Sequence, residues 1–237
     1  NARLIERLKP GDPLVLMGPT GEPTHIPENK NILVIAGSWG AAVMLNLAPA
    51  LRAKGNKVVY LATYRSSKEL YFKQEIQQIS DQMLWVCAEK PQIKAERPQD
   101  LSFIHGDIIE MLKSYARIQP GKQAVALSEI DEVLVMGSTG LLIALQKAFK
   151  QELKSLFSKN PKVIGTVGSP MQCMLKGVCA QCLQWQIDPE TGERTQTVFT
   201  CAMQDQALEK IDLETLSARQ KQNKLTKNGK INAKTAA

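Results

Sequence analysis

Aromatic residues are scarce in this chain of 237 residues: Phe, Trp and Tyr together make up 5% of it, and there are only two histidines. So few aromatic side chains offer little for stacking on bases, and we do not expect nucleic-acid binding. The sequence has no run of about 18 apolar residues, which predicts that no helix spans a membrane. Its first residues are polar and charged, so we predict no signal peptide and expect a cytoplasmic location.

The net charge of +7 is concentrated at the end of the chain. From Arg219 to Ala237 there are six basic residues and no acidic one, so residues 1–218 carry a net charge of only +1. Spaced lysines among Asn, Thr and Gly are typical of a solvated terminal segment, with a weak tether to an acidic partner as the alternative. We therefore interpret residues 206–237 as a polar, basic tail.

Apolar stretches alternate with helical patterns over most of the chain. The stretches predict strands at 31–36, 57–62, 82–87, 132–136 and 163–167, the last of which we expect to close the sheet. The helical patterns lie near 42–54, 67–80, 107–116 and from the turn at 137–140 to about 157. This alternation predicts an α/β fold with a parallel sheet that is buried on both faces.

The first 27 residues have a different pattern. Leu14–Met17 is a short apolar stretch between glycine- and proline-rich turns, and it predicts a strand. A single strand has no sheet of its own, so we expect its partners to lie upstream of Asn1. The chain begins within what looks like an ongoing element, and we expect it to be part of a longer protein.

Two glycine turns follow predicted strands and precede predicted helices. Gly37 and Gly40 form the first, and Gly137 and Gly140 the second. Glycine lets the backbone approach a diphosphate, and a helix N-terminus adds amide donors, although such turns also occur for packing reasons alone. Arg65 follows the second strand, where the ribose of a dinucleotide would lie. The alternative is that Arg65 belongs to a solvated loop that caps the next helix.

Four of the five cysteines lie within about thirty residues, in the spacing C-x5-C-x2-C-x18-C. A predicted hairpin, with strands at 183–187 and 194–199, folds the last of them back toward the others. Nothing marks the chain as exported, which disfavours disulfides. The spacing suits a structural zinc and a [2Fe–2S] cluster about equally, and a nucleotide-binding sheet upstream favours the cluster. The four residues are Cys173, Cys179, Cys182 and Cys201.

The remaining candidate ligands lie apart from these four. Cys87 ends a predicted buried strand, and we interpret it as a core thiol. His25 and His105 have no metal or triad spacing, and we interpret both as surface or core residues.

Three segments resemble a known family. They are Gly11-Asp-Pro-Leu followed by Gly18-Pro-Thr-Gly-Glu-Pro, then residues 31–42, and then the cysteine segment. Together they are similar to the electron-transfer subunit of dihydroorotate dehydrogenase B. They also resemble the flavin subunits of ferredoxin–NADP transhydrogenase and sulfide dehydrogenase, within the ferredoxin–NADP reductase superfamily. The resemblance covers about residues 8–202.

This resemblance implies a division of the chain. Residues 1–27 would be the end of a flavin-binding β-barrel, and 28–167 an NAD(P)-binding α/β domain of the ferredoxin–NADP reductase type. Residues 168–205 would be a small β-hairpin segment that holds a [2Fe–2S] cluster, followed by the tail at 206–237. The implied cofactors are FAD, held largely by the barrel, NAD or NADP, and the cluster.

The resemblance also implies roles for particular residues. The nicotinamide-nucleotide loop would comprise Gly37, Ser38, Trp39 and Gly40. Arg65 falls on the arginine on the adenosine side, and Gly137 on a glycine near the nicotinamide. The cluster ligands would be Cys173, Cys179, Cys182 and Cys201. The chain departs from the family where Ser38 replaces a glycine, where Val43 and Ser138 replace prolines, and in the five-residue gap after Cys173, which is usually four.

The function implied is that of an NAD(P)H-linked oxidoreductase component. It would pass electrons between NAD(P)H, FAD and a [2Fe–2S] cluster to a partner subunit or fused domain, without acid–base catalysis by the protein. The alternative is a non-catalytic interaction module with a degenerate nucleotide loop and a structural zinc site.

Overall fold

The computed structural model describes residues 7–15, 18, 21–37, 40–119, 121–168, 173 and 175–222. Ser38 and Trp39 of the predicted nucleotide loop lie outside the described residues. None of the described helices is long and apolar enough to cross a membrane.

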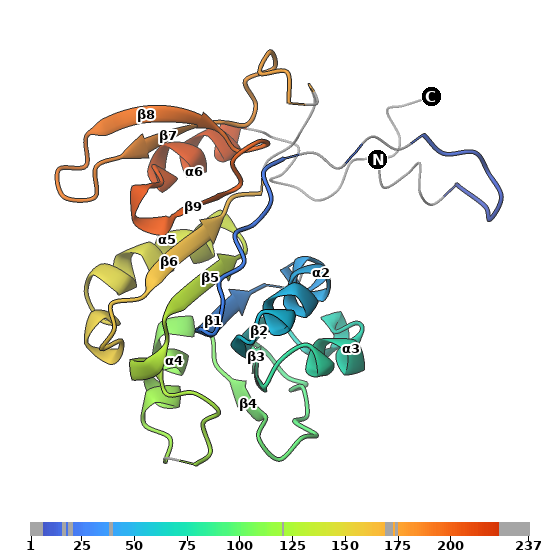
Figure 1. Ribbon diagram of the computed structural model, residues 1–237, viewed down its shortest axis with the longest axis vertical. Helices are drawn as coiled ribbons and strands as arrows, with labels where there is room; N and C mark the ends of the chain where they lie inside the picture. The colour runs from blue at the N-terminus through green and yellow to red at the C-terminus, as the bar shows by residue number, and fades with distance from the viewer. Residues whose placement is uncertain are drawn as a thin grey trace.

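A seven-stranded sheet forms the centre of the molecule, in the order β4-β3-β2-β1-β5-β6-β9 (Figure 1). Its first six strands are parallel and β9 pairs antiparallel with β6. The α/β fold with a parallel sheet is therefore confirmed. The strands are β1 (Asn31–Ala36), β2 (Lys57–Tyr64), β3 (Gln82–Cys87), β4 (Leu101–Ile104), β5 (Glu132–Met136), β6 (Lys162–Thr166) and β9 (Asp205–Ala207).

Helices cover both faces of this sheet (Figure 1). Successive strand residues point to opposite faces, so each central strand supplies side chains to two cores. Ile32 and Val34 pack on the side of α2 (Gly40–Ala53) and α3 (Lys73–Gln78). Leu33 and Ile35 pack on the side of α4 (Ile108–Ala116) and α5 (Thr139–Lys150). Double burial explains why β1 is apolar at nearly every position.

Two predicted helices are shorter in the structure. The pattern at 67–80 becomes the single turn η1 (Ser67–Glu69) followed by α3, because Phe72 between them adopts a left-handed φ of 50°. The helix predicted to continue to about 157 ends at Lys150 and is followed by η3 (Lys154–Leu156). Local amphipathic pattern did not reveal either interruption.

Two strands were not predicted. β4 lies between the strand predicted at 82–87 and the helix predicted near 107–116, and it is a four-residue edge strand with partly exposed side chains. β9 pairs with β6, so the prediction that residues 163–167 close the sheet was wrong. Both edge strands are short and depend on a neighbour far away in the sequence, which leaves little local signal.

The predicted tail also begins later than expected. After β9, residues Leu208–Lys210 form the turn η4, and Leu213–Gln222 form the helix α6, which packs on α5. Leu208, Leu213 and Leu216 are buried in the core on that side. The interpretation of residues 206–222 as a solvated tail was therefore wrong, and residues 223–237 lie outside the described residues.

The predicted hairpin is present as β7 (Leu183–Ile187) and β8 (Arg194–Phe199). The hairpin is linked to the segment before α6, because Asp212 donates its backbone N–H to the Trp185 carbonyl at 3.1 Å. At the other end of the chain, Leu14 and Val15 form no strand and are exposed. The rest of that predicted strand lies outside the described residues, and its assignment to a flavin barrel stays a prediction.

Candidate functional site

The two glycine turns lie side by side at the carboxyl edge of the sheet. β1 and β5 are neighbours with Ala36 opposite Met136, so each turn begins at the same level. The Gly37 N–H donates to the Met136 carbonyl at 2.9 Å, which links the first turn to the end of β5. The two turns therefore lie together at the edge where open α/β sheets bind ligands.

Gly40 is the first residue of α2 and lies against the ends of two strands. A Cβ at this position would lie 2.6 Å from the Cβ of Ala36 and 3.0 Å from the Met136 carbonyl oxygen. The absence of a side chain therefore lets the helix N-terminus approach the sheet edge. Gly37 differs, because among the described residues the nearest neighbour of a Cβ there would be the Thr63 hydroxyl at 3.8 Å, an ordinary van der Waals contact.

The second turn leads into α5. Ser138 caps this helix, since its hydroxyl accepts a hydrogen bond from the Leu141 N–H at 3.2 Å. A cavity of about 250 Å³ opens beside the turn, lined by Gly137, Ser138, Thr139, Leu142, Val167, Gly168 and Gln220. The N-termini of α2 and α5 both face this edge, and each contributes partial positive charge.

Gln220 of α6 is a residue of this edge that we did not predict. The Thr139 hydroxyl donates to Gln220 Oε1 at 2.7 Å, which ties the C-terminal helix to the second turn. Because we interpreted this segment as a tail, we did not identify Gln220 as a site residue. Nothing in the local sequence indicates where α6 packs.

Arg65 follows β2 at the same edge, as predicted, but its guanidinium is already paired. Its Nε lies 3.2 Å from Glu89 Oε1, and its backbone N–H donates to Glu69 Oε2 at 3.1 Å. Both side chains of the ion pair are more than half exposed, so solvent weakens the pair. Two carboxylates thus accompany the arginine, and the sequence did not reveal that Glu89, at the end of the neighbouring strand, is its partner.

The loop that carries the first three cysteines turns repeatedly through left-handed backbone. Leu175, Gly177 and Ala180 have φ values of 67°, 69° and 52°. Left-handed residues let a short loop turn its N–H groups toward one point, and concavities of this kind bind anions and iron–sulfur clusters. In this loop the backbone N–H groups of three residues, Gly177 to Cys179, are directed at Cys173.

Cys173 receives several of these donors. A hydrogen bond from the Cys179 backbone N–H, with further bonds from Val178 and Gly177, lowers the pKa of the Cys173 thiol to about 7. Hydrogen bonding to the charged form favours it, so this loop stabilises a thiolate. The Cys179 side chain also hydrogen-bonds Cys173, which makes these two residues a pair.

Cys182 and Cys201 form the second pair. Their sulfurs are 3.1 Å apart, well beyond the length of an S–S bond, and both thiols are free. The Cys182 carbonyl accepts hydrogen bonds from the Thr200 N–H at 3.0 Å and the Thr200 hydroxyl at 3.1 Å, which hold the strand ends together. The hydrogen bond with Cys182, together with burial, raises the pKa of the Cys201 thiol to about 11.

The two pairs are near each other, since Cys173 also contributes electrostatically to the raised pKa of Cys201. Among the described residues, no three or more His, Cys, Asp or Glu side chains form a group that could hold a metal ion. Two thiol pairs with amide donors do fit a binuclear cluster, in which each iron takes two thiolates. The assignment of the four cysteines as ligands stays a prediction.

The opposite pKa shifts predict unequal reactivity in protein freed of metal. Only the thiolate is alkylated, so Cys173, with a pKa of about 7, should be half reactive near neutral pH. Cys201, with a pKa of about 11, should react appreciably only in strongly alkaline solution. Timed iodoacetamide labelling from pH 6 to 10 with peptide mapping measures both rates. Equal rates for the two residues at neutral pH would contradict the described hydrogen bonding.

The remaining residues are placed as follows. Cys87 is fully buried, which confirms it as a core thiol. His25 is exposed and His105 is partly exposed, with its Nδ1 accepting the Asp107 N–H at 3.1 Å. Neither histidine joins a metal site among the described residues.

The fold is that of the ferredoxin–NADP reductase type. It matches a solved structure of an NADH-dependent reduced ferredoxin–NADP oxidoreductase, described in connection with flavin-based electron bifurcation. The TM-score is 0.68 at 21% sequence identity, over 94% of this chain and 68% of the other. No family model matches the chain.

Among curated proteins, the chain is similar to electron-transfer subunits of dihydroorotate dehydrogenase B. It is 24% identical to the subunit from Enterococcus faecalis over 193 residues, which are 79% of this chain and 62% of the relative. It is 32% identical over 77 residues to a homologue of this subunit from Thermotoga maritima, over 27% of that protein. The resemblance predicted from the sequence is therefore confirmed.

A further relative is the uncharacterized protein RP006 of Rickettsia prowazekii. The two are 28% identical over 222 residues, which cover 94% of this chain and 22% of that protein. The chain thus spans about a fifth of this relative and about three fifths of the Enterococcus subunit.

Proposed function

We propose that this chain is the electron-transfer module of a flavin- and iron–sulfur-dependent oxidoreductase. In this function, electrons pass between NAD(P)H, FAD and a [2Fe–2S] cluster, and then to a partner subunit or a fused domain. The observation that carries the proposal is the cysteine loop, with its two thiol pairs and the backbone N–H groups that hydrogen-bond Cys173, in a chain with a sheet of the ferredoxin–NADP reductase type.

The residues of the loop fit the cluster by their donor chemistry. Cys173 and Cys179 would hold one iron and Cys182 and Cys201 the other, since the thiols already lie in these pairs. Backbone N–H groups that donate to ligand sulfurs stabilise their negative charge and so influence the reduction potential. Such a cluster supplies one-electron transfer, and a flavin divides the electron pair that a nicotinamide delivers.

The carboxyl edge of the sheet would bind the nicotinamide nucleotide. Gly37 has no Cβ, so phosphate oxygens could approach its backbone, and Gly40 brings the N-terminus of α2 to the edge. Gly137 and Ser138 would line the nicotinamide end, beside the cavity that Gln220 also lines. The protein itself would bind and orient the nucleotide and exclude water, without acting as an acid or a base.

The proposal is tested by measuring iron, zinc and the visible and EPR spectra of the anaerobically purified, full-length protein in which this chain occurs. We expect about two irons per chain and an EPR signal after reduction. Stoichiometric zinc without visible absorption would favour the alternative, an interaction module with a structural zinc. Titration with NADH and NADPH then separates the functions, because an interaction module would reduce no flavin.

The carboxylates beside Arg65 predict a preference for NADH over NADPH. Glu89 pairs with the guanidinium, and Glu69 accepts the Arg65 N–H, so an incoming 2′-phosphate would meet negative charge. Carboxylates at this position of a dinucleotide site suit the ribose hydroxyls of NAD instead. We expect Glu89→Gln to improve the NADPH/NADH ratio of kcat/KM about fivefold, which is about 1 kcal/mol.

The control for this prediction is Glu75→Gln. Glu75 is an exposed carboxylate on α3 that makes no ion pair among the described residues, so the same change of charge should leave the ratio unaltered. Equal shifts in both variants would mean that net charge, and not the pair with Arg65, sets the preference.

A further inference from the structure

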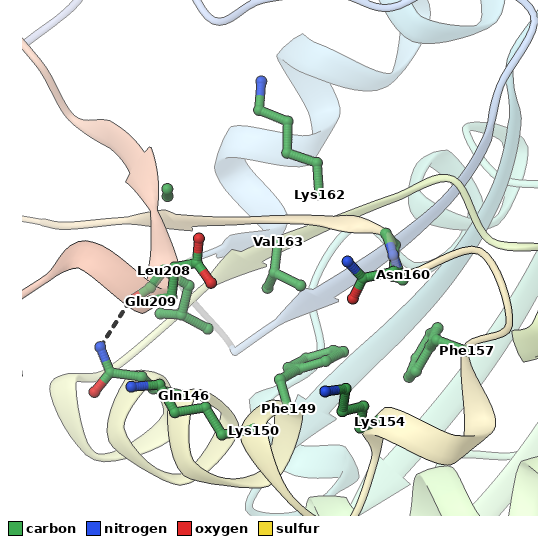
Figure 2. Close-up of a pocket in the computed structure, with 12 residues that line it drawn as sticks. Gln146, Phe149, Lys150, Lys154, Phe157, Asn160, Lys162, Val163, Leu208 and Glu209 are labelled. Atoms are coloured by element: carbon green, nitrogen blue, oxygen red, sulfur yellow. Dashed lines mark hydrogen bonds between the residues drawn. The ribbon is translucent and has the colours of Figure 1, made fainter. Parts of the chain in front are cut away.

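A second cavity lies at the opposite end of the sheet from the glycine turns, between α5, η3 and the start of β6 (Figure 2). Its volume is about 300 Å³, at the lower end of the range for small-molecule sites. Its walls come from two parts of the molecule. α5, η3 and β6 precede the cysteines in the chain, while η4 and β9, the antiparallel edge strand of the same sheet, follow them.

The floor of this cavity is apolar and contains two phenyl rings. The rings of Phe149 and Phe157 lie 5.2 Å apart between centroids and are tilted by 43°. Val163 points from β6 toward the rings, and Leu208 lies beside it (Figure 2). Phe157 and Leu208 are buried, with exposed fractions of 4% and 1%, whereas Phe149 and Val163 are partly exposed. A ring or a short acyl group can therefore cover Phe149 and Val163, with release of water from both surfaces.

The rim is polar and unevenly charged. Figure 2 shows Lys154 and Asn160 at the end of the cavity near Phe157, and Glu209 with Gln146 at the other end. Lys154 makes no ion pair among the described residues, so its ammonium group is free to meet an anion. The nearby Lys150 ammonium group instead donates to the Pro189 carbonyl at 2.8 Å.

Lys162 also lines the cavity but points from the opposite side of β6 to Val163 (Figure 2). Its charge therefore adds to the positive field of this end without entering the apolar space. Glu209 lies away from Lys154 and Asn160, so the charge distribution favours a ligand whose anionic group is directed toward those two residues.

We propose that this cavity binds a small amphipathic carboxylate. The apolar body lies on Phe149 and Val163, and the carboxylate accepts hydrogen bonds from the Lys154 ammonium and the Asn160 amide. The site is independent of the nucleotide edge and of the cysteines. It is also too small for a dinucleotide, since a volume of about 300 Å³ accommodates a single ring with a short chain.

Binding in this cavity would link α5 to the segment 205–210 that follows the cysteines. That contact already involves Gln146, whose amide donates to the carbonyls of Leu208 at 2.7 Å and Ile211 at 2.9 Å. A ligand that touches both Phe149 and the partly exposed Ala207 binds only when the two segments are together. It therefore stabilises η4 against α5, in proportion to its occupancy.

The test uses three probes with the same phenylpropyl body. They are 3-phenylpropanoate, its neutral amide and the corresponding amine, titrated into the full-length protein with ligand-observed NMR. We expect the carboxylate to bind with a Kd of about 1 mM or below and the other two at least about fivefold more weakly. Hydrogen exchange of residues 205–211 should slow when the carboxylate is present, and equal binding of all three probes would overturn the proposal.

Variants locate the site on the protein. Lys154→Gln should weaken carboxylate binding about fivefold and leave the amide unchanged, because it removes charge but keeps length. Lys147→Gln is the matched control, since Lys147 is exposed on the same helix but does not line the cavity. Phe149→Leu should weaken all three probes. Carboxylate binding that survives both Lys154→Gln and Phe149→Leu unchanged would overturn the proposal, as would the absence of binding to the unaltered protein.

Discussion

Replacing Cys182 with serine is expected to remove nearly all bound iron and the visible absorption of the protein. Cys182 is the most buried of the four ligand candidates, with an exposed fraction of 1%, and its sulfur lies 3.1 Å from that of Cys201. Serine preserves the size of the side chain but replaces the soft thiolate ligand that iron–sulfur clusters require. The iron content should fall from about two per chain to near zero, measured together with the EPR signal of the reduced protein.

Cys87→Ala is the control for this experiment. Cys87 is fully buried at the end of β3 and belongs to the core beside α2 and α3, away from the cysteine loop. Its loss should lower stability by about 1–2 kcal/mol through a small cavity while the iron content stays unchanged. If Cys182→Ser retained its full iron content, the assignment of the cysteine loop as a cluster site would be wrong.

Replacing Gly40 with alanine is expected to destabilise the chain and to abolish nucleotide binding. The added methyl group would lie 2.6 Å from the Ala36 Cβ and 3.0 Å from the Met136 carbonyl oxygen, neither of which can rotate away. The N-terminus of α2 must therefore move from the sheet edge, at a cost of about 1–3 kcal/mol. Urea unfolding followed by circular dichroism measures the change, and titration with NADH measures the binding.

Gly37→Ala separates the two effects. Among the described residues, its methyl group would have no neighbour nearer than the Thr63 hydroxyl at 3.8 Å, and the backbone φ lies outside the left-handed region. Stability should therefore stay within about 1 kcal/mol of the unaltered chain. NADH affinity should still fall about tenfold or more, because the methyl group occupies the space over the turn that phosphates would use. Unchanged affinity in Gly37→Ala would place the nucleotide elsewhere.

The sequence alone determined the elements whose burial or chemistry is local. β1 was predicted with its observed bounds because a strand buried on both faces must be apolar at nearly every position. The turns at Gly37 and Gly137 and the cysteine hairpin were equally apparent, since glycine position and strand alternation are properties of neighbouring residues. These features were enough to predict an α/β sheet followed by a cysteine segment.

Only the tertiary structure decided features that depend on distant residues. β9 is a strand because β6 offers an open edge about forty residues earlier, and α6 is ordered because Leu213 and Leu216 reach the core beside α5. The pairing of Arg65 with Glu89 and the contact of Gln220 with Thr139 have the same origin. The cysteine spacing predicted four candidate ligands. Their arrangement in two pairs depends on the left-handed residues of the loop and on the hairpin that returns Cys201 to Cys182. The spacing alone does not reveal this pairing.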